Sequence, residues 1–393
     1  MRSLSPLSGL SGLLSMVLNL QFIFLPNLRI VCRFCFQAWH SAVEFKRSLL
    51  QYLSEYGSFS MMSCLDITGC YEQESTFLPI YRYLQSIHVD YRFDSKVFDI
   101  KLCAEDIHRF VEKIKIQHSD CCTYKVLGRT DILIFAPGST ISESMIGTSH
   151  SAPAWRRSDE LAEPLDESWS LWLQLSDRDP GLGDPYNFCT RQVESMLESF
   201  TITTGDDSFI RHLRSLLPCD SEAGTLISLQ ESQWKINLCL PMQPVFTDQP
   251  AGILVAWGFA SFPTRKGYFV RKAMARCSGT EILCELLGHL NLHNLTPTET
   301  TLIPRIMPRM SASLLTRSPG DRPTINPEET CNIGLVGQFV EIPGLSSVDV
   351  SYGVHTAKMV VSRLMGLGAD NPGYGTQYKS GLTALCIRIL FGK

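Results

Sequence analysis

The sequence predicts an α/β protein, and three observations support that fold class. Segments with apolar side chains at helical spacing alternate with short runs of strand character, and two apolar runs end in glycine-containing loops. Of the 393 residues, 44% are hydrophobic and 19% charged, which excludes a disordered protein. The net charge of −4 lacks the basic surplus of nucleic-acid-binding proteins, so no nucleic-acid partner is predicted.

The first half of the chain contains two predicted helices followed by strands. Residues 39–56 and 74–87 place apolar side chains three to four positions apart, which is typical of amphipathic helices. Residues 97–102 alternate like a strand, and residues 104–118 are predicted to be helical. Residues 140–185 are rich in Ser, Asp, Pro and Gly, so we expect a linker or an irregular surface excursion there.

The second half follows a similar alternation. Helices are predicted over residues 188–200, 280–290 and 354–367, and Thr280 with Glu281 would begin the middle one. Residues 295–330 contain six prolines and little periodicity, so no element is predicted there. Three short strands are predicted between turn residues: Leu226–Leu229, Lys235–Leu240 and Ile253–Ala256.

Two similar runs stand out, each a short apolar strand followed by glycine. Residues 131–136 lead into Pro137-Gly138-Ser139, and residues 331–339 contain Gly337-Gln338-Phe339 before a predicted helix. In doubly wound flavoproteins such strand ends and a helix N-terminus face the cofactor, where free backbone N–H groups bind it. Ordinary buried strands of any α/β protein are the alternative. The candidate cofactor-binding residues are Gly138, Ser139, Gly337, Gln338, Phe339, Val354, His355 and Thr356.

The sequence lacks the common catalytic and phosphate-binding motifs. It contains no G-x-G-x-x-G, nucleophile elbow, P-loop or H-E-x-x-H pattern. Cys32 and Cys35 form a lone C-x-x-C, and nothing nearby completes a site at His289 and His293, so no metal is predicted. The 14 cysteines show no disulfide framework, which favours reduced thiols and a cytoplasmic protein.

Residues 1–28 form an apolar leader. The prolines and the polar residues Asn19 and Gln21 interrupt it, so we expect no membrane span there.

Several stretches resemble the oleate hydratase family, formerly called myosin-cross-reactive antigens. They follow the order of that family and cover residues ~30 to ~368. The stretches are FCFQAWHSAVEFKR (34–47), YEQESTFLPIYRYL (71–84), ESFTITTGDDSF (198–209), GTLISLQESQWKINLCLPMQP (224–244), WGFASFPTRKGYFVRKAM (257–274), CSGTEILCELLGHL (277–290), GDRPTINPEETCNIGLVGQFVEIPG (320–344) and SYGVHTAKMVVSRLMGL (351–367).

The resemblance implies an FAD-dependent lyase that adds water to the cis double bond of unsaturated fatty acids, giving hydroxy fatty acids. The acid that protonates the alkene is a Tyr in the family segment that matches residues 70–75, and Tyr71 is the only Tyr there. Residues 308–317 match a segment that contacts the substrate carboxylate, which makes Ser311, Ser313 and Arg317 the candidates here.

The resemblance also implies a flavoprotein-like FAD-binding fold with an inserted α+β substrate domain. We expect that fold to be incomplete, because the glycine fingerprint and the water-activating glutamate of the family's first half are missing. The expected division is a leader (1–28), part of the FAD-binding and substrate region (29–150), a substrate domain (151–330), the last strand and helix of the FAD-binding domain (331–368) and a tail (369–393).

Two alternatives stay open at this point. One is an inactive fragment that still binds fatty acid, and the other is a flavin oxidoreductase of the amine-oxidase type, which residues 331–367 would also fit. The expected partner is an oleate-like fatty acid. A peripheral contact with a membrane and a homodimer are both compatible with the sequence.

Overall fold

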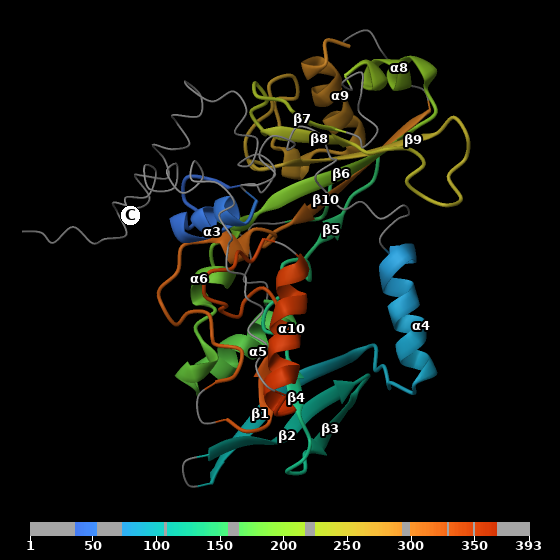
Figure 1. The fold of residues 1–393 in the computed structure, drawn as a ribbon. Coiled ribbons are helices and arrows are strands. Elements are labelled where there is room, and N and C mark those ends of the chain that lie inside the picture. The colour runs from blue at the N-terminus through green and yellow to red at the C-terminus, as the bar shows by residue number, and fades with distance from the viewer. Residues whose placement is uncertain are drawn as a thin grey trace, which may run out of the picture.

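The computed structural model describes residues 36–52, 73–105, 108–155, 165–216, 225–292, 299–327, 330–348 and 350–367. Within these ranges the chain combines helices with sheets of six, three and two strands (Figure 1). The predicted α/β class is therefore confirmed at this level.

The six-stranded sheet is antiparallel throughout, in the order β5-β10-β6-β9-β8-β7. Three of its strands match predicted ones, since β7, β8 and β9 cover the three short strands expected between turn residues. Its strands are β5 (Met145–Ile146), β6 (Leu197–Thr204), β7 (Thr225–Ser228), β8 (Ile236–Leu240), β9 (Leu254–Ala260) and β10 (Thr300–Met307).

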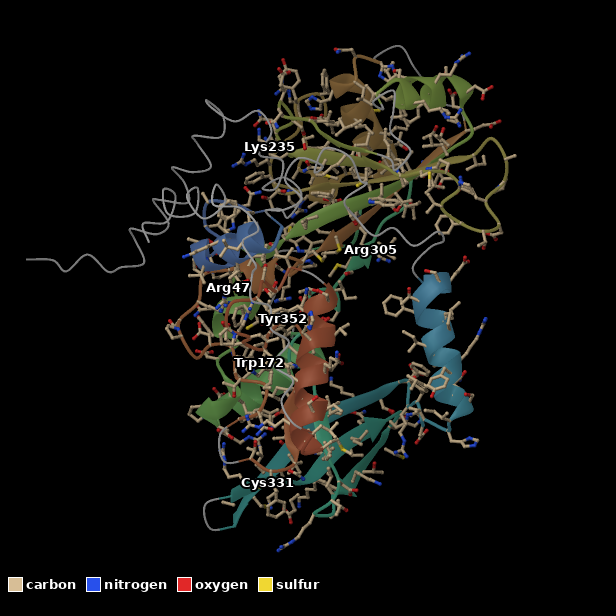
Figure 2. All side chains as sticks on the ribbon, in the orientation of Figure 1. Arg47, Trp172, Lys235, Arg305, Cys331 and Tyr352 are labelled. Atoms are coloured by element: carbon tan, nitrogen blue, oxygen red, sulfur yellow. The ribbon has the colours of Figure 1, made fainter. Side chains whose placement is uncertain are left out.

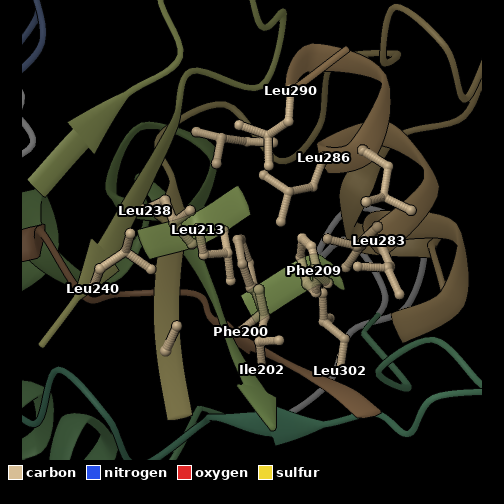
Figure 3. Close-up of a cluster of buried hydrophobic side chains, with 14 of the residues drawn as sticks. Phe200, Ile202, Phe209, Leu213, Leu238, Leu240, Leu283, Leu286, Leu290 and Leu302 are labelled. Carbon is tan, nitrogen blue, oxygen red and sulfur yellow. The ribbon is translucent and has the colours of Figure 1, made fainter. Parts of the chain in front are cut away.

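Two helices cover one face of this sheet and form the largest core with it. Helix α8 (Asp207–Ser215) and helix α9 (Gly279–His289) place apolar side chains against Phe200, Ile202 and Leu302 (Figure 3). Helix α9 was predicted, but a capping box of Ser278 and Glu281 begins it, two residues before Thr280.

A three-stranded antiparallel meander lies at the other end of the molecule (Figure 1). It consists of β1 (Ser95–Glu105), β2 (His108–His118) and β3 (Cys121–Val126). The helix predicted over 104–118 is therefore wrong. Ile114 and Ile116 alternate with lysines in this stretch, which is the period of a strand. As β2, the stretch pairs with β1 on one side and with β3 on the other.

Two other expectations also need correction. The predicted linker over 140–185 contains helix α5 (Glu167–Ser176), a 3₁₀ turn (Pro180–Leu182) and β5. The helix predicted over 188–200 is two short helices, α6 (Tyr186–Cys189) and α7 (Gln192–Ser195), followed by the start of β6. Residues 197–200 are extended because β6 pairs with β9 and β10. The spacing of apolar residues along the chain does not reveal such pairing with distant strands.

Strand β10 was not predicted because Pro304 lies inside it. The carbonyl oxygen of Pro304 accepts a hydrogen bond from the Gly147 N–H at 2.9 Å, on the side of β5. The N–H that proline lacks would point to that same side, where β5 ends at Ile146. The missing donor therefore removes little from the sheet.

The two glycine-terminated runs form a parallel pair, β4 (Leu133–Phe135) and β11 (Ile333–Leu335). Helix α10 (Val350–Leu364) packs on this pair so closely that a Cβ on Gly334 would lie 2.2 Å from Val360 Cγ1. Both strands and α10 were predicted, although α10 begins four residues before the expected Val354.

The other described elements connect these layers. They are α3 (Ala42–Tyr52), α4 (Leu78–Ser86) with a π-helical turn before it (Gln73–Phe77), and the 3₁₀ turns Met274–Arg276 and Ala312–Leu314. Among the described residues, no helix is both long enough and apolar enough to cross a membrane.

We predict opposite effects from two glycine substitutions at the β11–α10 contact. Gly334→Ala should lower the free energy of unfolding by about 1–3 kcal/mol, because the added methyl group meets Val360. Gly353→Ala is the matched control. Nothing lies within 4 Å of its added Cβ, so alanine should raise helix stability by about 0.5–1 kcal/mol. Urea denaturation measures both, and equal effects at the two sites would contradict the packing argument.

Candidate functional site

The carboxyl ends of β4 and β11 lie side by side. Leu335 is the register partner of Phe135, and the Val336 N–H continues the pairing to the Phe135 carbonyl at 3.0 Å. The backbone then turns at Gly138 and Gly337, with φ of 66° and 98°. Such φ values suit glycine. The structure thus brings together the two loops that the sequence analysis paired only by their similarity.

The loop after β4 rests on an aromatic cluster. A Cβ on Gly138 would approach the Trp169 ring to 2.9 Å and Phe339 to 3.1 Å. The Trp169 indole N–H donates to the Ser139 carbonyl at 3.0 Å. Phe339 is only 2% exposed and packs against Trp169, Trp172 and Phe188. Packing therefore explains Gly138 and Phe339 without a ligand.

The loop after β11 is held by helix α10 and is open on one side. The Gly337 N–H donates to the buried Thr356 Oγ1 at 2.9 Å. The Gln338 side chain donates to the Ser347 carbonyl at 3.2 Å. A Cβ on Gly337 would meet no atom within 4 Å, so a ligand can approach the backbone there.

The first turns of α10 contribute two further candidates. Val354 is 62% exposed, and His355 is half-buried. A Cβ on the neighbouring Gly353 would also meet nothing within 4 Å. The start of α10 is therefore open at Gly353, as the turn is at Gly337.

The candidates for carboxylate binding lie elsewhere, on the segment that contains the 3₁₀ turn Ala312–Leu314. The Ser311 hydroxyl donates to the Ser195 carbonyl at 3.0 Å and lies 3.5 Å from His40 Nε2. Ser313 is 3% exposed, and its carbonyl accepts from Arg322. The Ser311 hydroxyl is therefore already bonded within the protein, and Ser313 holds Arg322 through its main chain.

Arg317 belongs to a buried arginine–glutamate cluster, which we define as Glu44, Arg47, Arg317, Arg322 and Glu341. Arg317 Nη2 lies 2.7 Å from Glu44 Oε1 and 2.9 Å from Glu341 Oε2. Arg47 contacts the same two carboxylates at 3.1 and 2.7 Å, and Arg322 Nη1 lies 3.4 Å from Glu44. Figure 2 labels Arg47 on α3.

The cluster holds Glu44 ionised although its side chain is fully buried. Burial alone would raise the pKa of this carboxyl, but Arg322, Arg317 and Arg47 outweigh it and hold the pKa below its ordinary value. Three guanidinium groups face two carboxylates. Arg317 Nη1 and Arg322 Nε are buried and have no hydrogen-bond acceptor in the described part of the chain. The cluster therefore has donors left for one more anion.

His40 is a buried, neutral histidine beside this region. Its Nδ1 accepts from the Gln37 N–H at 3.1 Å, which places the ring proton on Nε2, 3.3 Å from the Glu194 carbonyl. Burial, with a smaller contribution from Arg191, lowers the pKa of His40 to about 4 despite the bond to Glu194. The sequence analysis assigned no function to His40, Glu44 or Glu341.

Several candidates lie outside the described residues, namely Tyr71, Cys32, Cys35 and His293. His289 is described and lies 3.2 Å from the Glu285 carboxylate. Over the described ranges, no group of three or more His, Cys, Asp or Glu residues is arranged to hold a metal ion.

Comparison with known proteins identifies the family. A family model for the MCRA family matches residues 28–362. The chain belongs to the MCRA family. Similar relatives are an oleate hydratase of Streptococcus pyogenes serotype M49 (strain NZ131), 27% identical over 362 residues, and a linoleate hydratase of Lactiplantibacillus plantarum, 25% identical over 364 residues.

These matches cover 88% and 86% of this chain but only 60% and 63% of the two relatives. The family match includes both strand ends and the arginine–glutamate cluster. Membership therefore confirms the family that the sequence motifs indicated, and it does so over the part of the chain that builds the candidate site.

We predict that His40 makes stability depend on pH. A folded-state pKa of about 4, against 6.5 unfolded, contributes stability above pH 6.5 that is lost as the pH falls to about 4. The loss should be about 3 kcal/mol and should disappear in His40→Gln. Urea denaturation across this pH range measures it.

His150→Gln is the control, because this side chain is exposed. It should keep the parental pH profile. If His40→Gln also keeps that profile, the buried neutral imidazole does not account for the loss.

Proposed function

We propose that this MCRA family protein takes part in adding water to the cis double bond of unsaturated fatty acids, as an FAD-dependent lyase. The observation that supports this most is the alignment of 86–88% of the chain with two hydratases whose names specify oleate and linoleate. The same region contains an open strand end and the arginine–glutamate cluster, in which two buried nitrogen donors lack acceptors among the described residues. A hydratase needs both features, one for its cofactor and one for a fatty-acid carboxylate.

The cofactor would bind at the β11–α10 junction. The open space beside Gly337 and Gly353 fits a group that approaches the backbone closely. Gln338, Val354, His355 and Thr356 lie on the same two segments and would contact the cofactor. When bound, the flavin would shape the site and stabilise developing charge, with no net redox change. Thr356 keeps the Gly337 turn in place by accepting its N–H.

The carboxylate of the fatty acid would bind at Arg317. This side chain is 10% exposed, and its Nη1 lacks an acceptor among the described residues. An anion at Nη1 would supply the hydrogen-bond acceptor that this nitrogen lacks. Its negative charge would also balance the positive charge by which the three arginines exceed the two glutamates. Ser311 lies six residues and Ser313 four residues earlier on the same segment.

Tyr71 would protonate the alkene. An unperturbed tyrosine has a pKa of about 10, so the hydroxyl carries its proton at neutral pH and is a weak but competent acid. The described chain resumes at Gln73, two residues later, and leads into α4. Chain position and the family resemblance support this assignment.

The direct test is incubation of the full chain with FAD and oleate, followed by mass spectrometry of the extracted lipid. Hydration adds one water to the fatty acid, whereas an oxidase would remove hydrogen. Oleate binding without any product would instead favour the fatty-acid-binding alternative. Absence of both binding and turnover would contradict the proposal.

We predict that Arg317→Gln weakens oleate binding by about 10- to 100-fold, because a charge-assisted hydrogen bond contributes ~1.5–3 kcal/mol. Arg47→Gln is a matched control. It removes a cation from the same two glutamates, yet Arg47 Nη1 and Nη2 both have partners. Fluorescence displacement at equal folded fractions measures the affinities. Equal losses in the two variants would show that the cluster only stabilises the fold.

We predict that Tyr71→Phe lowers the hydration rate by ~10²–10⁴-fold, the usual loss when a general acid is removed. Oleate affinity should stay unchanged, because only the hydroxyl is removed. Tyr81→Phe controls for the segment, since the Tyr81 hydroxyl accepts a hydrogen bond from the exposed Gln85 side chain at 2.8 Å. A Tyr71→Phe variant with the parental rate would place the acid elsewhere.

A further inference from the structure

The loop between β8 and β9, residues 241–253, is braced from within by two glutamine side chains. Gln249 Oε1 accepts the Val245 N–H at 2.7 Å, and its Nε2 donates to Gln243 Oε1 at 2.8 Å. Gln243 in turn bonds both backbone groups of Val255, its Nε2 donating at 2.8 Å and its Oε1 accepting at 3.1 Å. Val255 lies on β9, an inner strand of the six-stranded sheet. The loop is therefore fixed to the sheet by side-chain hydrogen bonds.

This braced loop holds the start of a distant segment. The hydroxyl of the exposed Thr247, in the middle of the loop, donates to Glu74 Oε2 at 2.9 Å, and the two residues are 173 positions apart in the chain. Glu74 lies in the π-helical turn before α4, and such turns occur frequently at functional sites. Helix α4 is described in full, and none of its side chains is buried (Figure 1). Packing therefore fixes this helix only weakly, and the hydrogen bond at its start contributes much of the restraint.

The restrained turn directly follows the proposed proton donor in the chain. Tyr71 precedes Glu74 by three residues, so chain connectivity alone keeps their Cα atoms within about 11 Å. A general acid acts only within hydrogen-bond reach of the reacting atom. A displacement of about 1 Å at a reacting group can lower a rate about 100-fold, even when the altered residue is remote. Whatever fixes Glu74 therefore restricts where the Tyr71 hydroxyl can be placed.

We propose that Thr247 is a positioning residue for the proton donor, because through Glu74 it holds the segment of Tyr71 against the six-stranded sheet. The same sheet leads through β10 into the segment that carries Ser311 and Arg317. The anchor would therefore set the distance between the acid and the carboxylate of the fatty acid. That distance selects the alkene carbon that receives the proton. This inference rests on the proposed function, to which it adds the residue that places the acid.

Hydration kinetics of the full chain with FAD and oleate test the proposal. Thr247→Val should lower kcat about 3- to 10-fold, the contribution of one hydrogen bond, and leave KM unchanged. Its products should carry the hydroxyl group at more than one position, which mass spectrometry of the extracted lipid detects. Thr247→Ser keeps the donor and should restore both properties. Glu74→Ala should lower kcat as much as Thr247→Val, and the double variant no further, because both changes remove the same bond.

Thr123→Val is the matched control, because it makes the same change at an exposed threonine on β3. It should behave like the parent. Amide hydrogen exchange over residues 73–77 supplies a readout without turnover, and it should become faster in Thr247→Val only. The proposal is overturned if Thr247→Val keeps the parental kcat and product, if Thr247→Ser fails to restore them, or if the losses at the two sites add. A parent that hydrates no oleate would refute the proposed function, whereas unchanged exchange in Thr247→Val would refute the anchor itself.

Discussion

The buried carboxylate of Glu44 is the constraint on which the arrangement of the candidate site depends. It lies on α3, yet its partners Arg317 and Arg322 follow it by 273 and 278 residues. A single carboxylate buried in an apolar interior would be neutralised or would destabilise the fold. Removing one partner from a buried ion pair typically destabilises a protein by about 3–5 kcal/mol. Helix α3, the 313–322 segment and the 341–347 segment are therefore held in one geometry, and no two of them can move independently.

Much of the fold could be predicted where the chemistry is local. The runs that became β4 and β11 were recognisable because short apolar strands end in glycine, and the backbone there does need positive φ. Residues 104–118 were predicted wrongly because Phe110, Val111 and Ile114 recur at helical spacing, whereas pairing with β1 and β3 makes the stretch a strand. Local periodicity cannot distinguish the two when distant pairing decides.

The candidate site was predicted less completely, for a physical reason. Arg317 was found through its segment, but nothing near it in sequence indicates that Glu44 lies 2.7 Å away. Among the described residues, Arg317 and Arg322 keep donors without acceptors because three arginines converge on two glutamates. Likewise, the packing of Gly138 on Trp169 explains that glycine without a cofactor, whereas the open side of Gly337 does not. The two glycines occur in similar sequence patterns, but the structure gives them different surroundings.

The two halves of the candidate site share one residue. The Ser347 carbonyl accepts from Gln338, beside the open turn at Gly337. The hydroxyl of the same residue accepts from Arg322 at 2.9 Å, and its N–H donates to Glu44 at 3.3 Å. Glu341 also follows Gly337 by only four residues along the chain. A displacement of the 341–347 segment would therefore move an anchor of the strand-end turn and an anchor of the arginine–glutamate cluster together. The 341–347 segment is therefore the physical connection between the two halves of the candidate site.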